Sequence, residues 1–189
     1  NNKMTTTVPG KPTTRFEDID WLPKPNFLQT YVSETLPDFP DLFFAGFTFV
    51  FDTEGKMLLT KLKQRGWDLP GGKIEDQDKV KGKPFQEWLK TTAIRETKEE
   101  TGVDIKDLKL VGYRHIHCKE QTYSKKGYKY PSPDSYLTYY YALVDKINPL
   151  MIEGQENGAV ERGFFAPEDI RKMPVVQESH PSIYERASV

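Results

Sequence analysis

Three glutamates lie close together in the stretch RETKEETGV and could bind a metal ion. Glu96, Glu99 and Glu100 are three and four residues apart. In a helix, which turns by about 100° per residue, they would share one stripe with Leu89 and Ala93. A stripe that begins apolar faces the protein body, so we expect its acidic continuation to point inward or into a cleft. Carboxylates at this spacing repel one another, and Mg²⁺, which prefers oxygen ligands, would compensate them. A solvated acidic face is the alternative.

A pair of glycines precedes this segment in the sequence WDLPGGKIE. Gly71 and Gly72 allow the backbone to approach a ligand or an ion closely, although the same pair could simply form a tight turn. We expect Lys73, next to the pair, to contact a substrate. Trp67 is either a platform for a nucleotide base or a core residue. The glycine turn, the loop and the acidic helix together indicate one ligand and metal site.

The loop and the helix resemble the signature of the Nudix hydrolase family. That signature runs Gly, five residues, Glu, seven residues, Arg-Glu, an apolar position, one residue, Glu-Glu, one residue, Gly and an apolar residue. Arg95, Gly102 and Val103 occupy their positions together with the three glutamates. Glu87 precedes Arg95 with the required seven residues between them. The motif covers about a fifth of the chain, and the similar order of elements extends over residues 42–173.

The chain departs from the signature at two places. Thr97 occupies the apolar position, where its methyl group can still pack. Fourteen residues separate Gly72 from Glu87 where the family has five, so nine are extra. We place these nine approximately at residues 76–84, as an exposed loop insertion, because lengthening a surface loop costs little entropy.

The resemblance implies an α/β protein, a Nudix-type α/β/α sandwich with a mixed β-sheet. It also implies Mg²⁺-dependent or Mn²⁺-dependent hydrolysis of a pyrophosphate linkage in a nucleoside diphosphate derivative. By the family's pattern Glu96, Glu99 and Glu100 are metal ligands or bases, and the carbonyl of Gly71 completes the metal shell. Arg95 and Glu87 resemble the pair that ties the loop to the helix.

The family often adds an acid from a later loop. Glu153, Glu156 and Glu161 compete for this role, and we favour Glu156 as a metal ligand. Two other functions stay open on the same fold: a nucleotide-binding or sensing module without turnover, and a purely structural cation site. Retention of three mutually repelling acids favours the hydrolase.

The remaining segments must position this site. The expected elements are a hairpin over 42–64, an irregular loop over 65–84, a helix from Pro84 to about Thr101, strands at 108–118 and 135–144, and a strand leading into a helix over 163–173. Residues 1–40, rich in Pro and Thr, predict an N-terminal arm before a hydrolase domain at 41–189. The apolar later part of the arm is expected to lie on the domain or on a partner chain, as in a homodimer.

Two further patterns each allow a ligand-binding interpretation and a purely structural one. His115 and His117 alternate along a predicted strand and share a face, either as a metal pair or, as we favour, as ordinary strand residues. The stretch 122–141 interleaves lysines with tyrosines, which could hold phosphate and stack a base or simply belong to strands.

Composition limits the other functions. The net charge is −1, from 27 basic and 28 acidic residues, which predicts no general attraction to nucleic acid or to an anionic membrane. Cys118 is the single cysteine, which is typical of a reducing compartment, so we expect a cytoplasmic protein with a small-molecule nucleotide substrate. No apolar run approaches the roughly 20 residues that a bilayer span requires.

Overall fold

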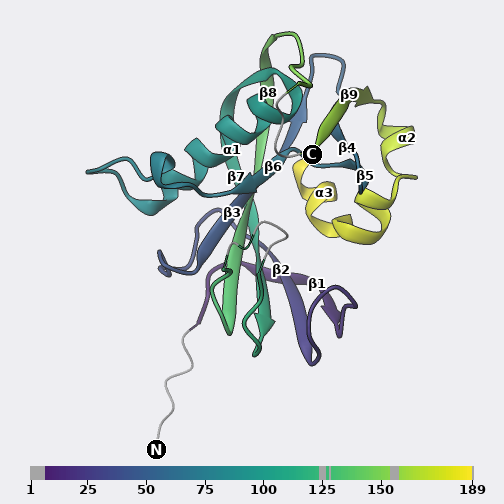
Figure 1. Ribbon diagram of the computed structural model, residues 1–189. Helices are drawn as coiled ribbons and strands as arrows, with labels where there is room; N and C mark the ends of the chain where they lie inside the picture. The colour runs from purple at the N-terminus through teal and green to yellow at the C-terminus, as the bar shows by residue number, and fades with distance from the viewer. Residues whose placement is uncertain (1–6, 124–126, 128, 154–157, 189) are drawn as a thin grey trace, which may run out of the picture.

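A mixed β-sheet forms the centre of the molecule (Figure 1). The computed structural model describes residues 7–123, 127, 129–153 and 158–188. Its strands are β1 (Lys11–Glu17), β2 (Asn26–Val32), β3 (Phe43–Phe51), β4 (Met57–Leu62), β5 (Gly66–Asp68), β6 (Gly71–Lys73), β7 (Val103–Cys118), β8 (Asp134–Ile147) and β9 (Ala159–Phe165). Within these described ranges the order is β1-β2-β7-β8-β3-β4-β5, with β6 on β3 and β9 on β4. β3 and β8 run parallel, whereas the neighbouring pairs β7–β8 and β2–β7 are antiparallel.

Helices cover both faces of this sheet (Figure 1). The helical segments are η1 (Asp76–Asp78), α1 (Phe85–Thr101), α2 (Pro167–Ile170), η2 (Val175–Ser179) and α3 (Pro181–Ala187). Neighbouring residues of β8 point to opposite layers: Tyr140 packs in the cluster that contains Leu89 of α1, and Tyr139 packs in the cluster that contains Tyr184 of α3. The expected α/β/α arrangement with a mixed sheet is confirmed. No helix among the described residues has the length and apolar character needed to cross a bilayer.

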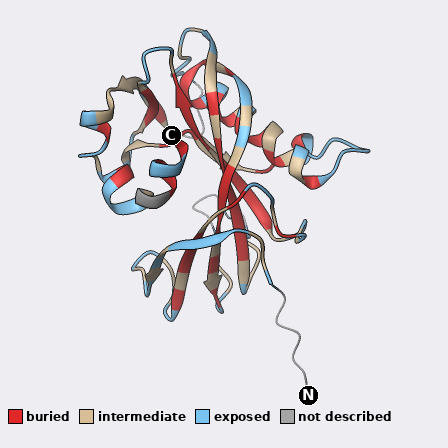
Figure 2. Ribbon diagram, turned by 180° about the vertical axis from the view of Figure 1, so that it is seen from behind, coloured by how far each residue is buried: buried red, intermediate tan, exposed pale blue. Residues whose placement is uncertain are grey.

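Helix α1 begins and ends as its sequence predicts. Pro84 precedes it in an extended conformation, and Gly102 ends it at φ 74°, in the left-handed region that glycine adopts without a Cβ penalty. One face of the helix is buried against the sheet and the other is exposed (Figure 2). The hairpin β3–β4 and the segment from β9 to α2 were also correctly predicted. The segment 65–84 is more regular than expected, because it contains β5, β6 and η1.

The N-terminal arm contributes two strands to the same sheet. β2 pairs with β7 from Asn26↔Cys118 to Val32↔Gly112, and β1 pairs with the outer side of β2. Leu28 is buried in the main core, whereas Trp21 is exposed. The later part of the arm therefore packs on its own chain, one of the two alternatives that the sequence left open. The division of the chain at residue 40 stays a prediction.

Candidate active site

The C-terminal half of α1 carries two buried acids. Leu89 and Ala93 are fully buried, and the same stripe continues into Glu96 and Glu100, which are 8% and 2% exposed. Glu99 lies at the edge of the stripe and is exposed. Burial of a carboxylate costs several kcal/mol unless partners replace water, roughly 3–5 kcal/mol for an unpaired charge. The alternative of a wholly solvated acidic face is therefore wrong for Glu96 and Glu100.

The glycine pair forms β6 and lies directly against these acids. The Gly71 amide donates a hydrogen bond to Glu100 Oε1 at 3.0 Å, and Gly71 pairs with Phe47 of β3. Gly72 leaves room for Glu96, since a Cβ at Gly72 would lie 2.5 Å from the Glu96 carboxyl carbon. Gly72 is thus required for the close approach of β6 to α1, and Gly71 for its close approach to β3, where a Cβ would lie 2.5 Å from the Gly46 carbonyl oxygen.

Arg95 connects the loop to the acidic helix. Its Nε and Nη2 donate to the two carboxylate oxygens of Asp78 at 2.9 and 2.8 Å, a bidentate ion pair. Nη2 also donates to the Lys73 carbonyl at 3.0 Å. Nη1 donates to Glu96 at 3.1 Å and to Glu99 at 3.2 Å. One guanidinium therefore holds the glycine turn, η1 and two of the three glutamates together.

The expected pairing of Arg95 with Glu87 is wrong, and Asp78 takes that place. Glu87 is exposed and pairs with Lys90 at 3.4 Å, eight residues and about 12 Å of helix away from Arg95. Asp78 is buried and also accepts from the Thr92 hydroxyl at 2.9 Å. Counted from Gly72, Asp78 follows after five residues. The nine extra residues thus lie at 79–87, between Asp78 and the signature residues of the helix, and not at 76–84.

Burial controls the ionisation of this group of acids. It raises the pKa of Glu96 to about 7, against the opposing effect of Arg95. It raises the pKa of Glu100 well above the ordinary value, and the Gly71 amide offsets only part of this. Burial also opposes the ionisation of Asp78, but the hydrogen bonds from Arg95, from the Glu75 amide and from Thr92 together with the charge of Arg95 outweigh it and lower the pKa of Asp78. The two glutamates are therefore under-compensated, in contrast to Asp78.

A divalent cation fits the chemistry of these donors. Glu96, Glu99 and Glu100 offer oxygen ligands only, which suits Mg²⁺ or Mn²⁺. Glu96 and Glu100 are buried, and the Arg95 guanidinium donates to Glu96 and Glu99. A cation bound here would supply the positive charge that the buried carboxylates lack.

The other residues expected to contact substrate lie around this group. Lys73 places its ammonium 5.1 Å from the centre of the Tyr130 ring, on the segment between β7 and β8. Trp67 is partly buried and packs edge-to-face on Phe165 at 4.9 Å, in agreement with the core alternative. Their contact with substrate stays a prediction.

The acids of the later loop do not join the group in the described residues. Glu161 lies on β9 and faces Lys61 at 3.8 Å, and Glu153 is exposed. Glu156 lies outside the described residues, so its assignment as a ligand stays a prediction. Lys125 and Lys126 of the lysine and tyrosine stretch also lie outside them.

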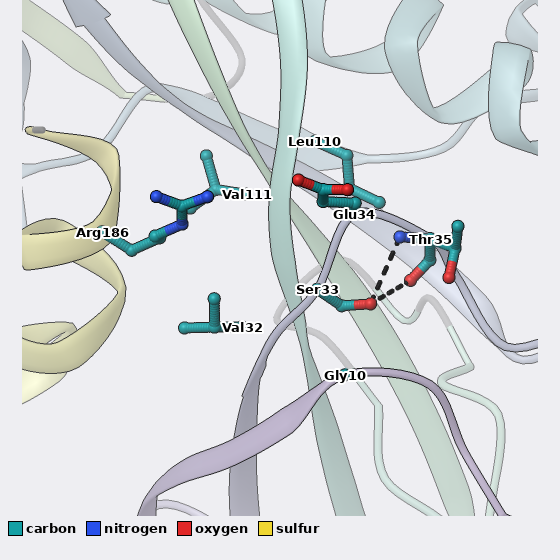
Figure 3. A pocket seen from close by; sticks show the side chains of 8 residues that line it. All are labelled: Gly10, Val32, Ser33, Glu34, Thr35, Leu110, Val111 and Arg186. Carbon is teal, nitrogen blue, oxygen red and sulfur yellow. Dashed lines mark hydrogen bonds between the residues drawn. The ribbon is translucent and has the colours of Figure 1, made fainter.

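A separate cavity of about 380 Å³ lies between β2, β7 and the C-terminal helix (Figure 3). Its charged residues are Glu34 and Arg186, and the Ser33 hydroxyl at its wall donates to the Thr35 carbonyl at 2.6 Å. None of the residues that line it belongs to α1 or β6. The acidic helix is therefore the stronger candidate for the active site.

Sequence reasoning located the acidic helix and the glycine turn but missed Asp78. The signal for Asp78 was its distance of five residues from Gly72, with aspartate in place of the glutamate of the signature. The spacing from Gly72 places the insertion at 79–87, and the spacing from Arg95 places it before Glu87, so the sequence allows both positions.

Comparison with known proteins gives a family match and several similar proteins. The model of the NUDIX domain matches residues 45–187. A curated relative, the putative 8-oxo-dGTP diphosphatase YtkD of Bacillus subtilis, is 39% identical over 74 residues, which make up 39% of this chain and 41% of the relative. A crystal structure of a variant of the Bacillus subtilis pyrophosphohydrolase BsRppH matches with a TM-score of 0.61 at 22% identity, over 92% of this chain and 95% of that one. The structural match establishes the likeness of fold.

Proposed function

Because the chain belongs to the Nudix family, we propose that it hydrolyses a pyrophosphate linkage in a nucleoside diphosphate or triphosphate, with a divalent cation bound to α1. The observation that carries the proposal is the pair of buried acids, Glu96 and Glu100, held against a glycine turn. A helix that served only for packing would place apolar side chains at these two positions, as it does at Leu89 and Ala93.

The substrate class follows from the chemistry of the site and from the relative. A polyphosphate chain carries several negative charges and requires cationic partners, which the carboxylates would recruit as a metal ion. YtkD is described as a putative 8-oxo-dGTP diphosphatase, and its match covers less than half of its length. We therefore take purine nucleoside triphosphates, oxidised and unmodified, as the first substrates to test.

The residues of this chain would each do a separate task. Glu96, Glu99 and Glu100 would hold Mg²⁺ or Mn²⁺. When bound, the cation supplies neutralisation of the phosphate charge and activation of the attacking water. Glu96 is the candidate to accept the proton of that water, since its carboxylate lies against the glycine turn where the phosphates would enter.

Two further residues keep these acids in place. Arg95 fixes Glu96 and Glu99 by hydrogen bonds and is itself fixed by Asp78. The Gly71 amide fixes Glu100. Hydrolysis of a phosphoanhydride depends mainly on positioning and charge stabilisation, so such fixed carboxylates are what the reaction requires.

A panel of nucleotides tests the proposal. The full chain is incubated with Mg²⁺ and 8-oxo-dGTP, dGTP, ADP-ribose or a dinucleoside polyphosphate, and the products are identified by mass. We expect a nucleoside monophosphate together with pyrophosphate or the second half of the substrate. Binding of nucleotides without products across the panel would favour the sensing module instead.

A further inference from the structure

A second group of metal-ligating side chains lies on the β7–β8 hairpin. His115 Nε2 and His117 Nδ1 each lie 2.7 Å from the same oxygen of Asp134, Oδ1. The three ligand atoms all lie within 4.8 Å of one another. Within the described residues, this group brings three His, Cys, Asp or Glu side chains close enough together to hold one metal ion. The sequence showed the two histidines, but the acid comes from the next strand, directly opposite His117 in the register.

Aromatic neighbours hold both imidazole rings in this orientation. His115 stacks on Tyr136 with ring centres 4.6 Å apart and an angle of 6°. His117 stacks on Phe27 at 5.0 Å and 15°, and Phe27 also meets His115 edge-on at 5.2 Å. Rings fixed by packing lose little entropy on binding a ligand, so the group is preorganised.

The group lies far from the acidic half of α1. β7 starts directly after α1 and runs back along it, so that Tyr113 lies in the same core cluster as Phe85, the first residue of the helix, and both rings contact Phe43. About 16 Å of helix separates Phe85 from Glu96. His115 and His117 follow Tyr113 in the opposite direction, about 7 and 13 Å further along the strand. In Figure 1 this end of the hairpin extends beyond α1, beside β2.

The site is accessible from solvent. The side chains of His115, His117 and Asp134 are 17%, 29% and 35% exposed. A cavity of about 230 Å³ borders His117 and Phe27 and is also lined by Arg15 and Asn26. A hydrated metal ion could therefore reach the two rings without unfolding of the hairpin.

We propose that His115, His117 and Asp134 form a binding site for a late first-row divalent cation such as Zn²⁺, which joins β7 to β8 at the end of the hairpin next to its connecting segment. Two imidazole nitrogens and one carboxylate oxygen are ligands that Zn²⁺ accepts, whereas Mg²⁺ prefers oxygen alone. Three protein ligands leave one position of a tetrahedral site for water or a small anion.

The geometry requires only small movements to admit the ion. Zinc bonds to nitrogen and oxygen are about 2.0–2.2 Å long, so ligands of a tetrahedral site lie roughly 3.4 Å apart. The two present nitrogen–oxygen distances of 2.7 Å would lengthen by less than about 1 Å, which rotation of Asp134 about its side-chain bonds provides. Each histidine stays neutral, and the proton on its ligating nitrogen moves to the other ring nitrogen.

Calorimetric titration with Zn²⁺ tests the site in the full, tag-free chain, depleted of metal and kept in excess Mg²⁺. We expect one equivalent of Zn²⁺ and a rise in the thermal midpoint. His117→Gln and Asp134→Asn should each weaken this binding by more than about tenfold and abolish the rise. Titration with Co²⁺ should give the visible absorption of a tetrahedral site, which both variants lose.

Two controls separate this site from the acidic helix and from surface carboxylates. The controls are Glu100→Gln, on the acidic helix, and Glu120→Gln, at an exposed acid just after β7. Both variants should bind Zn²⁺ as the unaltered chain does. Circular dichroism of each variant checks that it is folded. The proposal is overturned if the unaltered chain binds no Zn²⁺ in excess Mg²⁺. It is equally overturned if folded His117→Gln and Asp134→Asn bind as tightly, or if Glu100→Gln abolishes binding.

Discussion

The acidic half of α1 and the β7–β8 hairpin both gather potential metal ligands, but they compensate their charges differently. At the hairpin, burial opposes the ionisation of Asp134, yet the hydrogen bonds from His117 and His115 outweigh it and lower its pKa. On α1, burial dominates and raises the pKa of Glu96 and Glu100 despite Arg95 and the Gly71 amide. The histidines thus compensate the charge of Asp134 even before an ion binds at the hairpin, whereas the acids of α1 need additional positive charge. Folding alone would not select under-compensated acids, which supports the proposal that the acidic half of α1 is the catalytic region.

Removal of Arg95 should give the largest loss of stability. Arg95→Ala leaves Asp78 buried without its bidentate partner and removes the cation between Glu96 and Glu99. Loss of one member of a buried ion pair costs about 3–5 kcal/mol, and hydrolysis should fall as well. Denaturant unfolding measures the first effect. The matched control is Glu87→Ala, because Glu87 pairs with Lys90 at the surface and should cost less than about 1 kcal/mol. Equal losses in the two variants would restore Glu87 as the partner of the loop.

Substitutions of Gly72 and Gly71 by alanine should affect turnover and folding stability differently. In Gly72→Ala the new Cβ would lie 2.5 Å from the Glu96 carboxyl carbon and displace that carboxylate. A misplacement of about 1 Å can reduce turnover roughly 100-fold. Stability should change less, because the clash is with the end of a long side chain that can rotate away and not with backbone. In Gly71→Ala the Cβ would meet the Gly46 carbonyl and the Phe47 side chain. The free energy of unfolding should therefore fall by about 1–3 kcal/mol. Steady-state kinetics and thermal unfolding of both variants provide the test. Full turnover in Gly72→Ala would mean that Glu96 needs no fixed position.

The pH dependence of stability should have opposite signs in the two regions, in metal-free buffer. The pKa of Glu96 is raised in the folded state, so the folded chain binds more protons and gains stability as the pH falls from about 7 towards the unfolded value. The pKa of His115 is lowered, chiefly by burial, so the unfolded chain binds more protons and stability is lost as the pH falls below about 6.5. Each group contributes a slope of at most about 1.4 kcal/mol per pH unit.

Two variants resolve these contributions. Glu96→Gln should remove part of the gain at falling pH, because Glu100, whose pKa is also raised by burial, remains and contributes with the same sign. His115→Gln should remove part of the loss. His180, which is buried beneath Tyr139 with a lowered pKa, contributes a loss of the same sign as His115 and remains in both variants. Thermal midpoints measured in EDTA over roughly pH 5–8, a range that includes the pKa of Glu96 and the ordinary pKa of histidine, provide the measurement. Identical pH profiles in the unaltered chain and in Glu96→Gln would contradict the burial of an ionisable Glu96.

The inserted segment should have the smallest effect. Residues 81–83 are exposed, and a shorter loop changes the entropy of closure by less than about 1 kcal/mol. Deletion of Lys81–Lys83 should therefore leave the unfolding midpoint and turnover nearly unchanged. Extending the deletion to Asp78 should reproduce much of the loss of Arg95→Ala. A large loss on removing the three exposed residues alone would show that the loop itself supports η1.

The sequence was sufficient for the parts of the site that local spacing determines. The stripe of α1 and its end at Gly102 follow from helical periodicity and from glycine chemistry. The sequence placed Gly71 and Gly72 at the same site as the acids but did not predict that the Gly71 amide donates to Glu100. It was not sufficient for contacts made by chain reversal. Asp78 reaches Arg95 because η1 folds back onto α1, and Glu87 matched the spacing of the signature while lying on the solvent side.

The hairpin shows the same limit. His115 and His117 share a face by strand alternation, but Asp134 joins them only through the antiparallel register of β7 and β8. The two strands of the N-terminal arm were also missed as sheet members. They are short and lie in a segment whose prolines at 9, 23, 25 and 37 fall between and beside them. β2 joins the sheet only through its pairing with β7, a contact between residues 26–32 and 112–118.

Mg²⁺-dependent hydrolysis by the Glu99→Gln, Glu100→Gln double variant tests the central claim most directly. The substitutions keep the size of both side chains and remove two of the charges that would hold the cation. We expect the release of nucleoside monophosphate from the best substrate of the panel to fall by at least about 100-fold. In metal-free buffer the double variant should stay folded, with an unfolding midpoint equal to or above that of the unaltered chain, because repulsion among the acids is relieved. Full Mg²⁺-dependent activity in the folded double variant would contradict the account, since the acidic half of α1 would then not hold the catalytic cation.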